Sequence, residues 1–242
     1  GVAYFAGCTV DVVGTGYAIT ATAPGLPPVV SPSFAIMPPD APAPLTTTAS
    51  ALSITWGEEV TITSRLLPGP TSVARSVEFQ RSADGIRWTA LGVATPDVDG
   101  LTRLPIRPAT TFWYRAFFAG TPDLPAATSY PVRITVRQKL LLGASVAPPR
   151  TIAVGRTVTF TATVRPLLAD LPHPKVPFVV YRQVGTAWTL FRRTDVVADA
   201  SGRAVFAWRF PRAGSWYVRS MAQATQSNAA SAWSSLARYL VR

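Results

Sequence analysis

Residues that could carry acid–base or nucleophilic chemistry are scarce and poorly placed in this sequence. The single histidine, His173, lies between two prolines, which is typical of a loop residue rather than of a general base. Glu58 and Glu59 are adjacent, and neighbouring residues of a strand point to opposite faces, so they are expected to be turn and solvent residues. The sequence has no GxSxG, HExxH, P-loop or GxGxxG pattern. We therefore predict no catalytic residues and no enzyme activity.

Metal and cofactor chemistry has equally little support. Asp97 and Asp99, followed by Gly100, resemble the start of a calcium loop, but the further oxygen ligands and the distal glutamate of such a loop are missing. A parallel segment, 199–202, reads Asp-Ala-Ser-Gly. A hairpin turn with glycine in the left-handed conformation explains both segments. One cysteine and one histidine also exclude a self-contained zinc site. We predict no metal and no cofactor.

Tryptophan side chains raise a different prospect, the stacking of sugar rings. Trp88 and Trp188 recur at one position of an internal repeat described below, and so do Trp113 and Trp216. Recurrence at a fixed place favours a packing role for these four side chains over ligand binding. Trp208 and Trp233 are less constrained by this argument, and exposed binding aromatics remain the alternative.

Arginine side chains offer a third kind of chemistry, anion binding. The net charge is +11, and residues 139–242 hold fourteen basic and three acidic side chains. If several arginines share one sheet face, that face would attract anionic wall polymers, acidic glycans or phosphates. The alternative is a solvated sandwich with arginines distributed over its faces. Nucleic acid is not expected as a partner, because no aromatic RNP-type motif is present. The candidate face comprises Arg182, Arg192, Arg193, Arg209 and Arg219.

The elements that position these side chains are predicted to be β-strands. Over residues 157–165, valine, phenylalanine and alanine alternate with threonine and arginine, which places an apolar face on a core and a threonine face on water. Val60 and Ile62, interleaved with threonines, repeat the pattern. Short strands separated by proline and glycine turns favour an all-β fold of sandwiches. No apolar run approaches the ~20 residues of a membrane helix, so no membrane insertion is expected in this segment.

Composition also suggests how the chain divides into domains. Residues 38–44 are rich in proline, which fixes φ and lacks an N–H, so they indicate a stiff linker. A second boundary is expected at Gln138–Lys139, between strands predicted over 132–137 and 140–146. The predicted domains are 1–37, 45–138 and 139–242.

An internal repeat links the second and third domains. Five landmarks occur in the same order in both. Val77–Arg81 corresponds to Phe178–Arg182, and a glycine followed by a tryptophan recurs at one separation, at 85–88 and 185–188. The segment from Pro108 to Trp113 corresponds to that from Pro211 to Trp216. The pattern predicts a duplicated unit with about seven strands per copy.

These landmarks resemble the tandem immunoglobulin-like repeats of secreted and cell-surface bacterial proteins. The resemblance is carried by the segments 76–82 (SVEFQRS), 97–100 (DVDG), 107–115 (RPATTFWYR) and 127–136 (ATSYPVRITV). It covers almost all of 45–242 and implies tandem immunoglobulin-like β-sandwiches. Because it is a pattern of turns and core positions, it implies the fold more strongly than any function.

Residues 1–36 resemble the last three strands of another bacterial immunoglobulin-like type, with matching text at 2–11, 14–22 and 31–36. The resemblance implies a partial domain whose opening strands are missing. It also implies that Cys8 could pair with a cysteine in the missing region. We expect either upstream sequence of the same protein or a strand from a neighbouring subunit to complete this domain.

Together these features predict a non-catalytic structural or spacer segment of an extracellular bacterial surface protein or appendage, such as a stalk, filament or layer component. The expected partners are neighbouring domains or subunits of a surface assembly, with anionic glycans as a further candidate. Two alternatives stay open. One is an adhesin or a module that binds carbohydrate or anionic wall polymers, and the other is the accessory region of a secreted enzyme.

Overall fold

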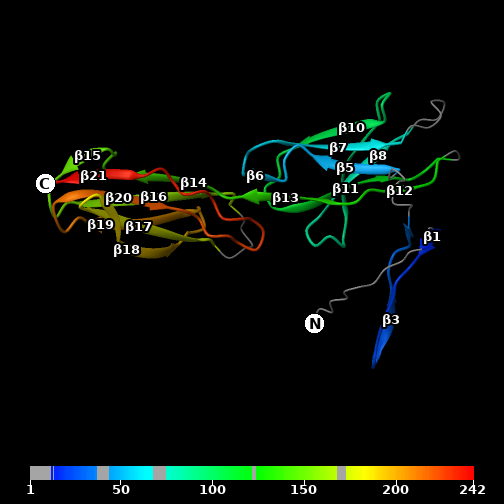
Figure 1. Ribbon diagram of the computed structural model, residues 1–242, viewed down its shortest axis with the longest axis horizontal. Coiled ribbons are helices and arrows are strands. Elements are labelled where there is room, and N and C mark those ends of the chain that lie inside the picture. The colour runs from blue at the N-terminus through cyan, green and yellow to red at the C-terminus, as the bar shows by residue number, and fades with distance from the viewer. Residues whose placement is uncertain (1–11, 13, 37–43, 68–74, 122–123, 168–172) are drawn as a thin grey trace. The chain divides into compact units, whose positions relative to one another are not determined.

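A computed structural model describes residues 12, 14–36, 44–67, 75–121, 124–167 and 173–242 of the chain (Figure 1). The fold is all-β: the described residues form twenty-one strands and no helix. Accordingly, none of the described residues belongs to a helix that is long and apolar enough to cross a membrane. The chain divides into two compact units, Gly1–Pro44 and Leu45–Arg242.

The first sandwich of the larger unit consists of two sheets. One sheet has the strand order β10-β7-β5, and the other has the order β6-β13-β11-β8-β9, with the short β12 paired to β11. Its strands are β5 (Leu45–Ala49), β6 (Ser53–Thr55), β7 (Val60–Leu66), β8 (Val77–Ser82), β9 (Thr89–Ala94), β10 (Leu101–Ile106), β11 (Phe112–Phe118), β12 (Ala127–Thr128) and β13 (Val132–Arg137).

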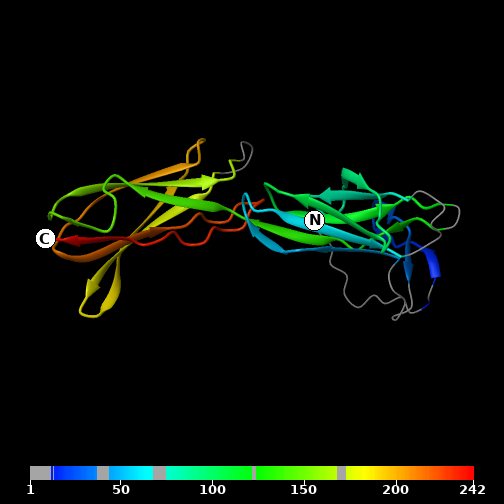
Figure 2. The same ribbon diagram turned by 90° about the horizontal axis from the view of Figure 1, so that it is seen from above.

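The second sandwich repeats this arrangement. One sheet has the order β14-β16-β19, and the other has the order β15-β21-β20-β17-β18. In Figure 2 the yellow hairpin of β17 and β18 protrudes at the edge of its sheet. The strands are β14 (Lys139–Ala144), β15 (Arg150–Ile152), β16 (Thr157–Arg165), β17 (Lys175–Val184), β18 (Ala187–Val197), β19 (Arg203–Arg209), β20 (Gly214–Ser220) and β21 (Ala237–Val241).

Both sandwiches have the strand order of an immunoglobulin-type fold. In each, the first, second and fifth main strands form one sheet, and the remaining strands form the other in the order G-F-C-C′. In each, a short strand also pairs in parallel with the last one, β6 with β13 and β15 with β21. The predicted fold class is confirmed, while the duplication that the sequence suggested stays a prediction.

Alternation along the strands builds a core between each pair of sheets. The core positions predicted from the alternation in two segments, Val60, Ile62, Val158 and Phe160, are at most 1% exposed, and so are Phe79 and Val180 in the facing sheets. The threonines predicted to face solvent are on the opposite face but half-buried: Thr61, Thr63, Thr159 and Thr161. Their strands, β7 and β16, lie in the middle of three-stranded sheets, so side chains of the flanking strands cover them in part.

The two Asp-x-x-Gly segments form the predicted turns. Gly100 and Gly202 have φ of 78° and 75°, in the left-handed region that favours glycine. In each turn the aspartate, Asp97 or Asp199, accepts hydrogen bonds from backbone N–H groups through its carboxylate. The glycine carbonyl then accepts a bond from β7 or β16, which fixes the turn against the sheet.

The smaller unit is described by two strand pairs. β1 (Gly14–Tyr17) pairs with β4 (Phe34–Ile36), and β2 (Thr20–Ala23) pairs with β3 (Leu26–Val30). The strand predicted over 14–22 is therefore divided between β1 and β2, because the chain changes its pairing partner between them. The predicted strand at 2–11 and Cys8 lie outside the described residues.

Candidate functional site

The five arginines of the predicted anion-binding face lie in different places. Arg209 is on β19, in the β14-β16-β19 sheet, and donates to the carbonyl of Gly155 at 3.1 Å. Arg182 is opposite Trp216, whose side chain is fully buried, and donates to the carbonyl of Ala213 at 3.1 Å. On the edge strand β18, Arg192 donates to Thr194.

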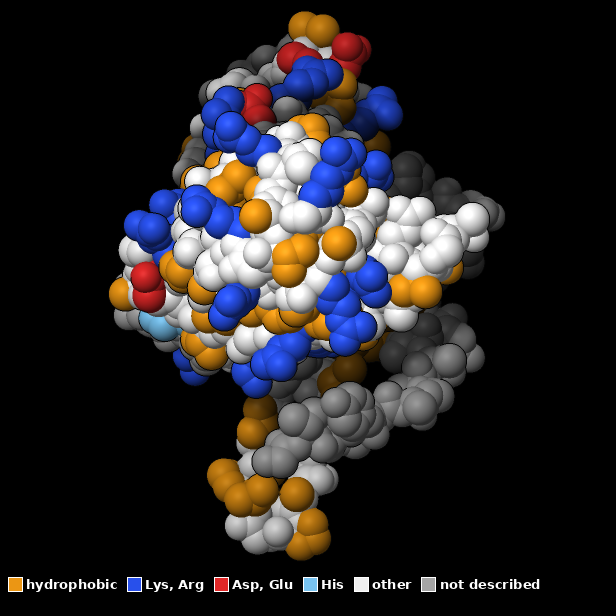
Figure 3. Space-filling view, turned by 90° about the vertical axis from the view of Figure 1, so that its left-hand side faces the viewer, with side chains coloured by type: hydrophobic (Ala, Val, Ile, Leu, Met, Phe, Trp, Pro, Cys, Tyr) orange, Lys and Arg blue, Asp and Glu red, His pale blue; other side chains and the backbone are white. Residues whose placement is uncertain are grey.

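The remaining two predicted arginines are on the outer face of the β15-β21-β20-β17-β18 sheet. Arg193 forms an ion pair with Asp195 at 3.0 Å, whereas Arg219 stands among aromatic rings. Figure 3, which shows the molecule from the side of the second sandwich, agrees with this distribution: basic side chains lie in several separate groups over the visible face and do not form a single patch. The five predicted arginines therefore do not constitute one site.

A more compact grouping occupies the outer face of the same sheet. Tyr217 is opposite Tyr181 in the β17–β20 register, and their rings stack at 4.6 Å. Trp188 meets Tyr217 edge-on at 4.7 Å. Tyr217 is only 8% exposed, whereas Trp188 is 39% exposed. Neighbouring side chains thus cover Tyr217, while the indole of Trp188 stays open to solvent.

Two arginines flank this aromatic group. Arg219 lies over the rings of Tyr181, at 5.2 Å, and Trp233, at 4.3 Å, and donates to the Tyr181 hydroxyl at 3.2 Å. Arg238 of β21 is opposite Tyr217 as well, on the side of β20 away from β17. Burial raises the pKa of the Tyr217 hydroxyl, and the charges of both arginines oppose that rise. We call Tyr181, Trp188, Tyr217, Arg219 and Arg238 the aromatic–arginine face.

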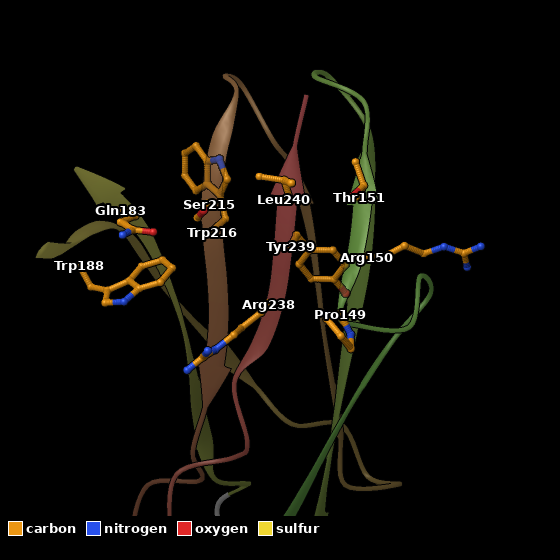
Figure 4. Close-up of a pocket in the computed structure, with 10 residues that line it drawn as sticks. All are labelled: Pro149, Arg150, Thr151, Gln183, Trp188, Ser215, Trp216, Arg238, Tyr239 and Leu240. Carbon is orange, nitrogen blue, oxygen red and sulfur yellow. The ribbon is translucent and has the colours of Figure 1, made fainter. Parts of the chain in front are cut away.

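A shallow depression of about 430 Å³ opens beside this group (Figure 4). Trp188 and Gln183 form one wall, from the β17–β18 hairpin, and Pro149 and Thr151 line the opposite side. Figure 4 shows the side chain of Arg238 extending from β21 toward the hairpin that carries Trp188. With Arg150 also in its lining, the depression combines an exposed aromatic ring, two cations and neutral polar groups.

Local sequence explains this arrangement. On β20 the side chains of Trp216 and Val218 belong to the core, so alternation turns Tyr217 and Arg219 outward. Ala237 and Tyr239 are buried on β21 in the same way, which places Arg238 outside. Arg238 was missed by the sequence reasoning. The alternation of residues 237–241 was the signal that could have found it.

The first sandwich has a related but neutralised surface. Trp88 is in the hairpin equivalent to that of Trp188, and Arg115 lies over its ring at 4.1 Å. Arg115 donates to Gln80 at 2.7 Å, and Gln80 donates to Glu78 at 2.6 Å. The cation is therefore bonded into a network that ends in a carboxylate. Among the described residues, no carboxylate forms an ion pair with Arg219 or Arg238.

The strand register corrects one sequence match. Identical spacing from a proline aligned Trp113 with Trp216, but Arg81 pairs with Tyr114 and its counterpart Arg182 pairs with Trp216. Tyr114 is thus the structural equivalent of Trp216, and both are core residues. Trp113 points outward, with Arg133 at 5.8 Å from its ring. The two prolines are not equivalent positions: Pro108 lies eight residues after Gly100, whereas Pro211 lies nine residues after Gly202, so a match made from the prolines is displaced by one position.

The other tryptophans divide between packing and surface. The packing role predicted for Trp216 is confirmed, and Trp208 packs beside the same core. By contrast Trp188 and Trp233 are 39% and 43% exposed. Recurrence of Trp88 and Trp188 therefore marks a fixed place on the hairpin, not a place in the core.

The carboxylates and the histidine take the structural places that the sequence suggested. Glu58 accepts from the N–H of Thr55, and Glu59 forms an ion pair with Arg107. His173 precedes β17 in an exposed loop. Within the described part of the chain, no group of three His, Cys, Asp or Glu residues is placed to hold a metal ion.

No protein-family model matches the chain, and none of the curated proteins matches it. Among solved structures, a red sea bream transglutaminase matches over 84% of this chain and 32% of its own, at 11% identity and a TM-score of 0.37. Trypsin-activated α2-macroglobulin from Escherichia coli matches over 95% of this chain and 18% of its own, at 12% identity and a TM-score of 0.34.

The D0–D1 domain of intimin matches over 81% of this chain and 97% of its own, at 14% identity and a TM-score of 0.29. The chain thus spans about a third of the transglutaminase and less than a fifth of the α2-macroglobulin. At these values the comparisons assign no activity and no partner to this chain.

Proposed function

We propose that this chain is a non-catalytic structural segment of an extracellular bacterial surface protein, in which two immunoglobulin-type sandwiches act together as a stiff spacer. The resemblance of residues 45–242 to repeats of bacterial surface proteins supports the location. The use of Glu58, Glu59, Asp97 and Asp199 in turns and an ion pair supports a non-catalytic role. The stalk is the form of spacer that we propose.

The observation that carries this proposal is the junction between the sandwiches. β13 ends at Arg137 and β14 begins at Lys139, so Gln138 alone connects them. Gln138 is 3% exposed and donates hydrogen bonds to the carbonyls of Gln223 and Ala229, in the loop between β20 and β21. A single buried residue leaves much less rotational freedom than a Gly/Ser linker would.

The loop that contacts Gln138 reinforces the junction. Asn228, also 3% exposed, donates to the carbonyls of Ala109 at 3.0 Å and Val136 at 3.4 Å. The backbone N–H of Ala229 donates to Val136, and that of Thr111 donates to Ser227. Removing partners from buried polar groups is costly, so these bonds oppose bending. A stiff junction is what a spacer requires.

Distances between spin labels test the proposal in the full chain. Labels at Val93→Cys on β9 and Val205→Cys on β19, both exposed positions, are introduced in a Cys8→Ser background. We expect a narrow distance distribution for this chain, and a broad one after a short Gly-Ser insertion following Gln138. Asn228→Ala should broaden the distribution, whereas Gln226→Ala, an exposed change in the same loop, should not. A parent distribution as broad as that of the insertion variant would refute the stiff spacer.

A further inference from the structure

We propose that the depression beside the aromatic–arginine face binds an acidic saccharide, with a uronic acid ring packed against Trp188 and its carboxylate paired with Arg238. This inference goes beyond the spacer role and does not depend on it. It concerns the second sandwich alone.

The aromatic wall of the depression gives the first reason. Trp188 is 39% exposed although it rests edge-on against Tyr217, which is supported in turn by Tyr181. The ring is thus held in place while one side remains available. A fixed, amphipathic ring gives contact area at a low cost in conformational entropy, and it suits the C–H face of a sugar.

Charge gives the second reason. Arg238 is exposed on β21 and lines the depression together with Arg150, and Arg219 follows Tyr217 on β20 and lies over Tyr181. The acids of the described part of the second sandwich are committed elsewhere, Asp195 to Arg193 and Asp199 to its turn. Guanidinium groups match carboxylates in geometry, so the uncompensated charge selects an acidic ligand over a neutral one.

The neutral polar lining gives the third reason. Gln183 belongs to one wall of the depression, Thr151 lies on the opposite side, and Ser215 lies between them (Figure 4). Amide and hydroxyl groups donate and accept hydrogen bonds, as the hydroxyls of a sugar require. A few polar groups among aromatic and apolar contacts are typical of small-molecule sites. An acidic peptide would pair with the arginine charge, but it would not account for the polar groups suited to sugar hydroxyls or for the exposed ring of Trp188.

Calorimetric titration of the full chain tests the site with oligogalacturonate as the probe. The methyl ester of the same oligosaccharide is the matched neutral ligand, and oligoglutamate is the matched acidic peptide. We expect oligogalacturonate to bind and its ester to bind at least about tenfold more weakly, the effect of losing one charge-assisted pair. Raising the ionic strength from about 0.05 M to about 0.5 M should also weaken binding.

Variants separate a local site from general attraction by a basic protein. Arg238→Gln should weaken binding by about tenfold, whereas Arg209→Gln, which removes the same charge from the other sheet, should change it by less than about twofold. Trp188→Ala should weaken binding by about tenfold. The matched change Trp88→Ala, in the hairpin of the first sandwich, should leave binding unchanged. Circular dichroism melts confirm that each variant remains folded.

Several results would overturn the inference. One is no binding of oligogalacturonate by the parent chain at millimolar concentration, and another is that Arg209→Gln weakens binding as much as Arg238→Gln does. Equal binding of the methyl ester would remove the carboxylate pairing. Equal binding of oligoglutamate would transfer the site to an acidic peptide. None of these outcomes bears on the stiffness of the junction, so the two proposals fail independently.

Discussion

At the residue scale, the core positions carry most of the stability and the charged residues shape turns. Phe160 is fully buried, with Phe206 at 6.3 Å and Tyr239 at 6.1 Å between ring centroids. Asp84 caps the turn after β8: its carboxylate accepts from the N–H groups of Ile86 and Arg87 and from the hydroxyl of Ser82. These roles lead to two predictions.

Replacing Phe160 by alanine should destabilise the second sandwich by about 3–5 kcal/mol, because the lost transfer free energy adds to the cost of a cavity. Chemical denaturation monitored by tryptophan fluorescence measures the loss. Val205→Ala is the control, since Val205 is 49% exposed on the same sheet and should cost less than about 0.5 kcal/mol. Equal losses from the two variants would contradict the assignment of the core face.

Asp84 should contribute to acid sensitivity. Its turn hydrogen bonds, led by that from Arg87, lower the pKa of the carboxyl from 3.8 to about 2. A depressed folded-state pKa means that its contribution is complete above about pH 4 and is lost as the pH falls toward 2. Asp84→Asn should therefore reduce the decrease in melting temperature between pH 4 and about pH 2. Asp99→Asn, which removes a charge from another exposed turn, serves as control; an equal effect would contradict the prediction.

At the element scale, the turns fix the strand register. The turns at Gly100 and Gly202 pair with β7 and β16 through the same set of backbone hydrogen bonds. An added Cβ at Gly100 would overlap the carbonyl oxygen of Leu66, while one at Gly185, at the tip of the β17–β18 hairpin, would meet nothing within 4 Å. Both glycines have positive φ, at 78° and 60°, so their comparison separates backbone strain from steric overlap.

Gly100→Ala should lower the unfolding free energy of the first sandwich by about 2–4 kcal/mol, because left-handed strain of about 1–2 kcal/mol is joined by a clash with the main chain. Gly185→Ala in the second sandwich should cost about 1 kcal/mol from strain alone. Thermal melts of the two variants supply the comparison. A smaller loss at Gly100 than at Gly185 would show that the Asp-x-x-Gly turn yields easily and does not hold the register.

At the scale of the whole molecule, the two sandwiches share a fold but differ in surface chemistry. In the first, Arg115 is linked through Gln80 to Glu78. In the second the equivalent position is Tyr217, close to Arg219 and Arg238, with which no described carboxylate forms an ion pair. The same architecture thus supports a neutralised surface in the first sandwich and a basic aromatic surface in the second. The spin-label experiment tests the junction between the two sandwiches, and the saccharide experiment tests the surface of the second one.

The sequence by itself determined the strands, their buried faces and the main turns. Period-two alternation identified Val158, Phe160 and Val164 as core residues, because a strand has only two faces and the apolar one must leave water. The Asp-x-x-Gly turns were also predictable, because only glycine adopts their left-handed φ without strain. These signals are local, and a single sequence contains them in full.

Only the tertiary structure decided which side chains share a surface. The five arginines predicted to share a face lie in different places. Arg238, fifty residues from Trp188 in the sequence, lines the same depression as Trp188. Trp113 points outward while Trp216 lies in the core, because the prolines from which the two were matched are not equivalent positions. Neighbours across a sheet are set by strand order and register, which depend on long-range pairing. A local pattern predicts the face of its strand on which a residue lies, but not which residues lie beside it on the neighbouring strands.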